Sequence, residues 1–196
     1  MRDIVDAIIR AKSVACNEEI RFFLCGVCLK QRDGKLDVVA TDGHMMLVET
    51  FDVPVELSHL NEFIIQREDV AKFEDAMGWL QKYYGRKKMI PSDAISLRLS
   101  QDGKFIVLAG RGFELTAERI DGQFPDYTKV LPNEDRTNVR VGFDLKKLRA
   151  VFESLDRNAS SPEHVEMLVD MNNNLNSLLI RTPGSKSQGI VMPVRI

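Results

Sequence analysis

One pattern occurs three times along the chain and constrains the fold more than any other feature of the sequence. Each copy is an amphipathic helix followed by three short strand-like runs, with apolar residues at helical spacing in segments 1–16, 67–88 and 144–157. Turn signals such as Asp33-Gly34 and Asp102-Gly103 separate the strand-like runs. A further apolar run precedes the second and third helices, whereas the first helix begins without one.

The strand-like runs divide the chain into three units of similar make-up. The predicted strands fall at 22–29, 36–41 and 45–51 in the first unit, at 63–65, 95–99, 105–109 and 113–117 in the second, and at 139–143, 165–169, 175–180 and 190–196 in the third. One helix over three short strands cannot bury its apolar stripe alone, so two units are expected to pair. We therefore predict an α+β chain with one complete domain, residues 1–132, and an unpaired half-domain, residues 133–196.

Composition excludes several classes of protein. Hydrophobic residues make up 44% of the 196 residues, which is enough for a core without disulfide or metal supports. The apolar runs are far shorter than the roughly 20 residues that cross a bilayer. Acidic residues inside the first apolar stretch, Asp3 and Asp6, argue against a signal peptide. Three cysteines do not make a disulfide framework, so we expect a cytoplasmic protein that has no contact with membranes.

Charge is distributed unevenly along the chain. The net charge of −2 excludes a uniformly basic nucleic-acid binder. The three helical segments nevertheless hold 13 basic and 9 acidic residues, and the remainder holds 14 basic and 20 acidic residues. Helix surfaces often carry Lys and Arg, which is one explanation. The other is that the helices share a face that meets a polyanion, since phosphate contacts need only suitably placed cations.

The residues that enzymes commonly use are scattered. Cys25 and Cys28 form a single C-x-x-C pair, but both lie in a strand-like run where their side chains point to opposite faces, so they are not expected to pair. Asp42 and His44 have no nucleophile motif beside them, and the chain has no glycine-rich phosphate-binding motif. No Cys or His cluster has metal-ligand spacing. We expect a non-catalytic protein without metal or cofactor, with a thiol oxidoreductase as an alternative.

Three stretches are unusual in composition: A-T-D-G-H at 40–44, I-D-G-Q-F-P-D-Y-T-K-V-L-P at 120–132, and V-M-P-V-R-I at 191–196. In this order they resemble the bacterial DNA polymerase III beta subunit family, the sliding clamps. Residues 1–132 resemble the family's middle domain, and residues 137–196 resemble the second half of its last domain. The resemblance implies the DNA-clamp fold, in which helix-and-sheet units form a ring whose helices face duplex DNA.

The resemblance also implies partners and a location. They are duplex DNA, bound without sequence readout, and peptides of DNA polymerases and the clamp loader, with the protein on the nucleoid in the cytoplasm. The DNA-facing candidates, chosen by their placement on helices, are Arg10, Lys12, Lys72, Lys82, Lys146, Lys147 and Arg149.

A peptide-binding pocket between the middle and last domains is a further implication of the resemblance. The matching positions are Leu24, Thr41, Gly43, His44, Met45, Met46, Pro125, Lys129, Val130, Val191, Met192, Pro193, Val194 and Arg195. Such a groove is apolar with a few polar groups and suits a Leu or Phe side chain. Met45 and Lys129 stand where the family commonly has Arg, and Met favours adaptable binding. Packing of the domain junction is the alternative role for these residues.

Our leading hypothesis is a shortened sliding clamp, a processivity factor that tethers a polymerase to DNA. A family ring has twelve helix-and-sheet units and this chain has three, which predicts a homotetramer in which half-domains complete each other across a subunit interface. The alternative is a clamp-like adaptor or decoy that binds clamp-binding peptides without encircling DNA.

Overall fold

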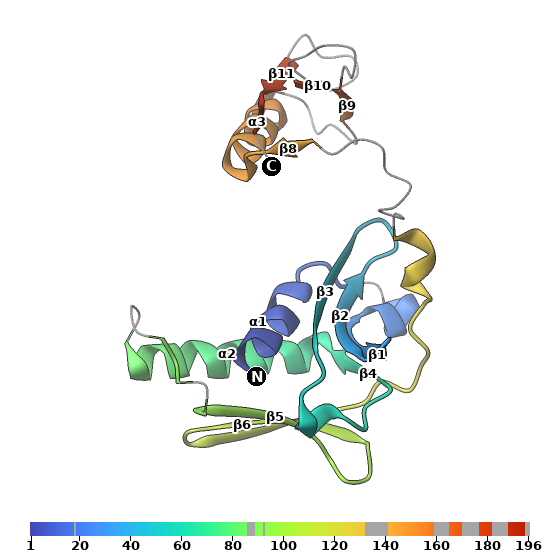
Figure 1. Ribbon diagram of the computed structural model, residues 1–196, viewed down its shortest axis with the longest axis vertical. Helices are drawn as coiled ribbons and strands as arrows, with labels where there is room; N and C mark the ends of the chain where they lie inside the picture. Colours follow the sequence, from blue (N-terminus) through green and yellow to red (C-terminus); the bar gives the residue numbers. More distant parts are fainter. Residues whose placement is uncertain are drawn as a thin grey trace. The chain divides into compact units, whose positions relative to one another are not determined.

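The computed structural model describes residues 1–17, 19–85, 89–91, 93–131, 141–158, 165–169, 177–181 and 188–194. The chain divides into two compact units, Met1–Asp126 (unit 1) and Tyr127–Ile196 (unit 2), shown in Figure 1. The predicted domain boundary at residue 132 stays a prediction, because residues 132–140 lie outside the described part.

Unit 1 begins with one helix and a meander of strands. Its first half contains α1 (Arg2–Ala11), the 3-10 helix η1 (Glu19–Leu24), β1 (Gly26–Arg32), β2 (Lys35–Thr41) and β3 (Met46–Asp52). Its second half contains the 3-10 helix η2 (Val55–Leu57), β4 (Glu62–Gln66), α2 (Arg67–Tyr84), β5 (Ile95–Leu99), β6 (Phe105–Gly110) and β7 (Phe113–Glu118). The two sheets have the orders β3-β2-β1-β4 and β5-β6-β7.

The two halves of unit 1 are joined through β4. This strand belongs by sequence to the second half, but it pairs antiparallel with β1 of the first half, with Cys28 opposite Ile64. The strands approach so closely at Gly26 that a Cβ atom there would lie 2.3 Å from the carbonyl oxygen of Ile65. Glycine is therefore required for this approach.

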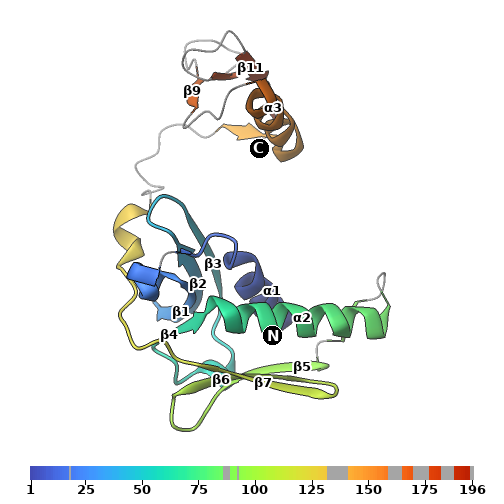
Figure 2. The same ribbon diagram turned by 180° about the vertical axis from the view of Figure 1, so that it is seen from behind.

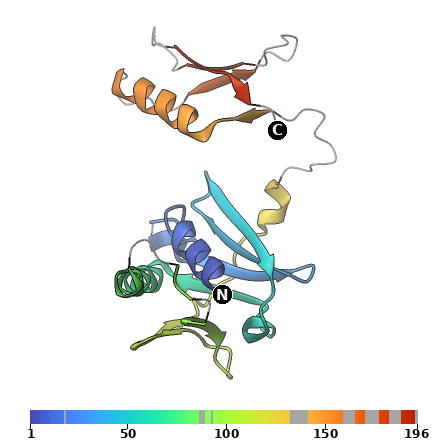
Figure 3. The ribbon, with the colours of Figure 1, turned by 60° about the vertical axis from the view of Figure 1, so that its left-hand side comes forward.

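The core of unit 1 lies where the helices meet both sheets. The helices α1 and α2 lie side by side (Figures 2 and 3), and each contacts strands of both sheets. Val5 and Ile8 of α1 and Val70 and Phe73 of α2 are fully buried in this core. Burying one such side chain contributes about 1.5–3 kcal/mol, and the apolar stripe of each helix is buried against both halves of the unit.

The described residues of unit 2 form one α-helix, a 3-10 helix and short strands. Its elements are η3 (Tyr127–Val130), β8 (Gly142–Phe143), α3 (Leu145–Asn158), β9 (Glu166–Val169), β10 (Leu178–Arg181), β11 (Gln188–Val191) and β12 (Pro193–Val194). The sheets have the orders β11-β10-β9 and β12-β8. Asp144 Oδ1 accepts the backbone N–H groups of Lys146 and Lys147 at 2.8 and 3.3 Å, which confirms the predicted helix cap.

Several predicted boundaries are wrong. The first helix ends at Ala11 rather than near residue 16, because the chain turns there and Ala15 is buried outside the helix. Residues 22–24 form part of η1 rather than a strand, since β1 begins only at Gly26, where β4 pairs with it. The C-terminal strand is interrupted at Met192, before Pro193, which has no N–H to continue a ladder.

Other expectations are confirmed or untested. Phe124 and Tyr127 are buried, as expected of anchors in the connector, although residues 127–130 form η3. The cluster 86–88, the strand residues 139–140 and 175–176, and His164 lie outside the described residues. Within the described part of the chain, no helix combines the length and apolarity needed to cross a membrane.

Candidate functional site

The A-T-D-G-H stretch forms the tight turn between β2 and β3. Asp42 Oδ1 accepts hydrogen bonds from the backbone N–H groups of His44 and Met45, each at 2.8 Å. The Thr41 hydroxyl donates to the Met45 carbonyl oxygen at 2.7 Å and accepts from the Gly43 N–H at 3.0 Å. Gly43 has a φ of 94°, a left-handed conformation that favours glycine. This bonding fixes the turn with His44 and Met45 exposed at its tip.

Asp42 stabilises this turn through its hydrogen bonds and is poorly suited to acid–base chemistry. Hydrogen bonds from the N–H groups of Met45 and then His44 lower the pKa of Asp42 below its ordinary value, because they favour the charged carboxylate. A general acid or base at neutral pH needs a pKa near the working pH, which is a shift in the opposite direction.

A cavity of about 280 Å³ lies beside the turn. Its lining residues come from the segment after α1 and from the turn: Ser13, Ala15, Cys16, Asn17, Asp42, His44 and Met45. His44 and Met45 are two of the predicted pocket residues. Of the others in unit 1, Leu24 is buried, Thr41 and Met46 are half-buried, and Gly43 and Pro125 are exposed.

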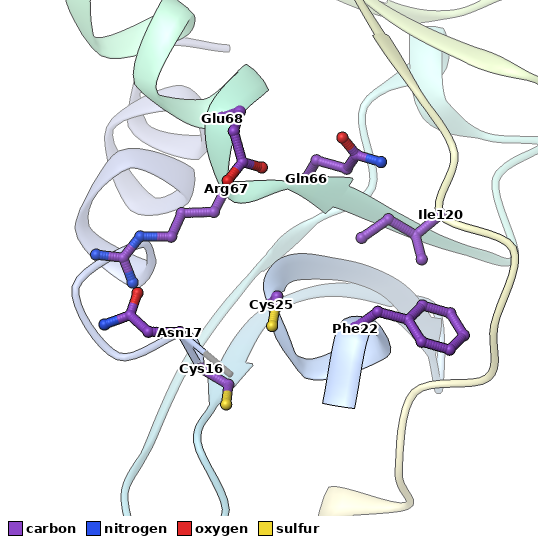
Figure 4. A pocket seen from close by; sticks show the side chains of 8 residues that line it. All are labelled: Cys16, Asn17, Phe22, Cys25, Gln66, Arg67, Glu68 and Ile120. Atoms are coloured by element: carbon purple, nitrogen blue, oxygen red, sulfur yellow. The ribbon is translucent and has the colours of Figure 1, made fainter. Parts of the chain in front are cut away.

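A second cavity, of about 330 Å³, lies where η1 meets the start of α2 (Figure 4). Its lining residues are Cys16, Asn17, Phe22, Cys25, Gln66, Arg67, Glu68 and Ile120. The Arg67 guanidinium donates to the Ala15 carbonyl oxygen at 3.0 Å, which ties the start of α2 to the segment after α1. Phe22 and Ile120 give the cavity an apolar side, and Arg67 and Glu68 give it a charged side.

Cys16 and Asn17 line both cavities, and sequence reasoning missed them. The apolar spacing through Ala15 predicts a helix to residue 16, which places Cys16 at the end of the helix and Asn17 just beyond it. In the structure the chain leaves the helix at Ala11, and the Cys16 N–H donates to the Leu24 carbonyl oxygen at 3.0 Å. The segment is thereby held against the start of β1.

The environment of the C-x-x-C pair differs from that of a redox site. Cys28 is buried in β1, whereas Cys25 lies just before this strand, so the prediction that both lie inside one strand is wrong. Burial raises the pKa of both thiols, strongly for Cys28, and for Cys25 the neighbouring Cys16 raises it further. A redox cysteine needs a lowered pKa. Cys16 and Cys28 are buried, and Cys25 is half-buried.

The pocket candidates of unit 2 differ in accessibility. Lys129 and Val130 of η3 are exposed, as are Met192 and Val194, and Pro193 is half-buried. Val191 is buried in the small core formed with Leu155. Arg195 lies outside the described residues.

The candidate DNA-facing cations of unit 1 are largely paired with carboxylates. Arg10 donates to Glu49 at 2.9 and 2.6 Å, Lys12 pairs with Glu74 of α2, and Lys72 pairs with Asp69 at 2.7 Å. Lys82 is exposed and has no ion-pair partner among the residues described. In unit 2, Lys146, Lys147 and Arg149 are exposed on the first turns of α3. Within the described ranges, no group of three or more His, Cys, Asp or Glu side chains could hold a metal ion.

This fold, with helices backed by antiparallel sheets in repeated units, is that of a DNA sliding clamp. The structure resembles the beta sliding clamp of Caulobacter crescentus with a TM-score of 0.76 at 20% identity, over 98% of this chain and 48% of that chain. It resembles the sliding clamp of Pseudomonas aeruginosa with a TM-score of 0.72 at 22% identity, over 98% of this chain and 49% of that one. The predicted α+β DNA-clamp fold is confirmed.

The sequence identifies the family. The family model for the central domain of the DNA polymerase III beta subunit matches residues 2–126, which are unit 1 without Met1. The chain belongs to the DNA polymerase III beta subunit family. It is 28% identical to the beta sliding clamp of Pseudomonas putida over 73% of this chain, and 26% identical to that of Synechocystis over 89% of it. These matches span 35% and 41% of the relatives, well under half of their length.

Proposed function

We propose that this protein is a sliding clamp, a non-catalytic processivity factor that encircles duplex DNA and docks peptides of DNA polymerases and the clamp loader. The observation that supports it most strongly is the family match over residues 2–126 together with the clamp fold. Both the low pKa of Asp42 and the raised thiol pKa values favour a non-catalytic role. The proposal places the protein on the nucleoid, in the cytoplasm.

Weak phosphate contacts are what a sliding protein needs. The carboxylates beside Arg10, Lys12 and Lys72 reduce the positive potential of α1 and α2, and Lys82 has no carboxylate partner among the described residues. Contacts to the DNA backbone have no sequence preference, and few of them give low affinity that falls with salt. Topological enclosure, rather than affinity, would then keep the protein on DNA.

Enclosure requires an oligomer. The chain holds three helix-and-sheet units, so a ring of twelve, which the resemblance implies, needs four copies. We expect a mass four times the 22.2 kDa of the chain by light scattering at micromolar concentration. A monomer would contradict the ring.

The decisive test is retention on a closed circle. The protein is assembled in the presence of nicked circular plasmid, and the mixture is passed over a sizing column in high salt. We expect the protein to elute with the circle and to be released when a restriction enzyme linearises it, since only a threaded ring depends on DNA ends. Binding that is equal on circular and linear DNA, or absent on both, would refute encirclement.

Peptide docking is tested in each unit separately. The probe is a fluorescein-labelled hexapeptide containing Leu and Phe, followed by fluorescence polarisation. Met46→Asp in unit 1 and Met192→Asp in unit 2 should each weaken binding at least tenfold, because each replaces an accessible apolar side chain with a charge. The matched control is Val55→Asp, which changes an exposed apolar residue outside the predicted pocket. Peptide binding without retention on circles would instead indicate the adaptor.

A further inference from the structure

Unit 1 shows how two helix-and-sheet halves complete each other. β4 immediately precedes α2, but it pairs with β1, the first strand after α1. Its Ile65 also forms a bridge to Arg119, which follows β7, so β4 has partners on both sides. The first residue of each helix reaches the other half: Arg2 donates to Gln81 at 3.4 Å, and Arg67 donates to the Ala15 carbonyl oxygen at 3.0 Å.

The described residues of unit 2 form the elements of one half only. β8 immediately precedes α3, as β4 precedes α2, and β9 is the first described strand after α3, as β1 is after α1. β12 follows β11 and pairs with β8. This pairing corresponds to the bridge in unit 1 between Ile65 of β4 and Arg119, which follows β7. Among the described residues, β8 has a partner only in β12 and β9 only in β10. Among these residues each strand therefore has one unpaired edge. In unit 1, β4 is paired with β1, the first strand after α1, whereas β5, the first strand after α2, has a partner only in β6 among the described residues.

Side-chain exposure on the strands agrees with this comparison. Val27, Cys28 and Leu29 of β1, a strand that has β2 on one side and β4 on the other, are 0% exposed. In β9, Met167 is 54% and Leu168 is 46% exposed. An apolar strand with an unpaired edge is a site for pairing with another chain.

The helices show the same difference. The fourth and seventh residues of α1 are Val5 and Ile8, and those of α2 are Val70 and Phe73, all fully buried. The fourth and seventh residues of α3, which are also apolar, are only half-buried. Its first residue, Leu145, is 72% exposed.

We propose that two copies of this chain pair through unit 2 about a twofold axis, each placing β8 beside β9 of the other, so that two half-domains form one complete two-helix domain. The inference rests on the proposed homo-oligomeric clamp and names one of its contact surfaces. A twofold axis makes the paired α3 helices antiparallel.

The test uses the full chain and its solution mass by light scattering at micromolar concentration. Leu145→Asp and Met167→Asp place a charge on the proposed surface at residues that are exposed within unit 2, so little loss of folding is expected. Each variant should halve the wild-type mass. The matched control, Val55→Asp, changes an 85% exposed apolar residue of unit 1 and should leave the mass unchanged.

Hydrogen exchange of the wild-type chain gives a second measurement that does not depend on how a variant folds. A peptide covering Glu166–Val169 should exchange at least tenfold more slowly at a concentration where the oligomer forms than after dilution to monomer. The pairing would be overturned, with the ring left intact, if both variants kept the wild-type mass and if dilution left the exchange rate of Glu166–Val169 unchanged. A wild-type monomer would overturn both the pairing and the ring, and peptide binding in the same sample would show whether docking survives.

Discussion

Replacing Gly26 with alanine should break the contact that joins the two halves of unit 1. The new Cβ atom would lie 2.3 Å from the Ile65 carbonyl oxygen and 2.9 Å from Ile64 Cγ2, against 3.4 Å or more for an ordinary contact. Relieving this clash requires β1 and β4 to separate by roughly 1 Å, which lengthens the hydrogen bonds of the ladder, and such overpacking costs about 3 kcal/mol. The lower entropy of the unfolded Ala chain offsets about 0.7 kcal/mol of this cost.

The expected net loss is therefore about 2 kcal/mol in the free energy of unfolding of unit 1, or roughly 5–8 °C in Tm. The single tryptophan, Trp79 on α2, reports the unfolding of unit 1 by its fluorescence during a urea titration. Gly78→Ala is the matched control, because Gly78 lies inside α2 with open space around it. There alanine should stabilise by about 0.5–1 kcal/mol. An unchanged urea midpoint for Gly26→Ala would refute the reasoning.

Three further outcomes follow from the site. Asp42 should titrate by NMR below the ordinary Asp pKa of about 3.9. Because its folded-state pKa is lowered, Asp42 should stabilise the turn above the ordinary pKa and lose that contribution as the pH falls through the lowered value; a pKa at or above 3.9 would contradict the observed hydrogen bonds. The Cys28 thiol should resist Ellman's reagent at pH 8 in the native protein and react fully in urea, because burial raises its pKa; rapid native reaction would contradict its burial. Lys82→Ala should reduce the salt-dependent binding of short duplex DNA more than Lys72→Ala does, because Lys72 is already paired with Asp69. Equal effects of the two substitutions would indicate that DNA does not bind at this face of α2.

Local sequence patterns predicted most of the elements. The apolar spacing from Val70 to Tyr84 predicts α2, and the residue type and position of Asp144 predict the cap of α3. The Asp42-Gly43 turn between two strands was also evident. These features depend on interactions between residues at most a few positions apart, which a sequence displays directly.

The candidate site was less predictable. His44 and Met45 were expected from the family motif, but their cavity is completed by Cys16 and Asn17, which have no motif. The ion pairs of Arg10 with Glu49 and Lys12 with Glu74 join residues 39 and 62 positions apart. Helix placement alone identified these cations as available for DNA and could not show the carboxylates beside them.

The sequence by itself determined that three helix-and-sheet units follow one another and that the count is uneven. Only the tertiary structure decided which strand edges are paired. β4 pairs with β1 of the other half, whereas β8 and β9 each have one unpaired edge among the described residues. The physical reason is that periodicity shows which face of an element is apolar, whereas its partner depends on contacts between distant segments. In unit 2, by our proposal, that partner belongs to a second copy of the chain.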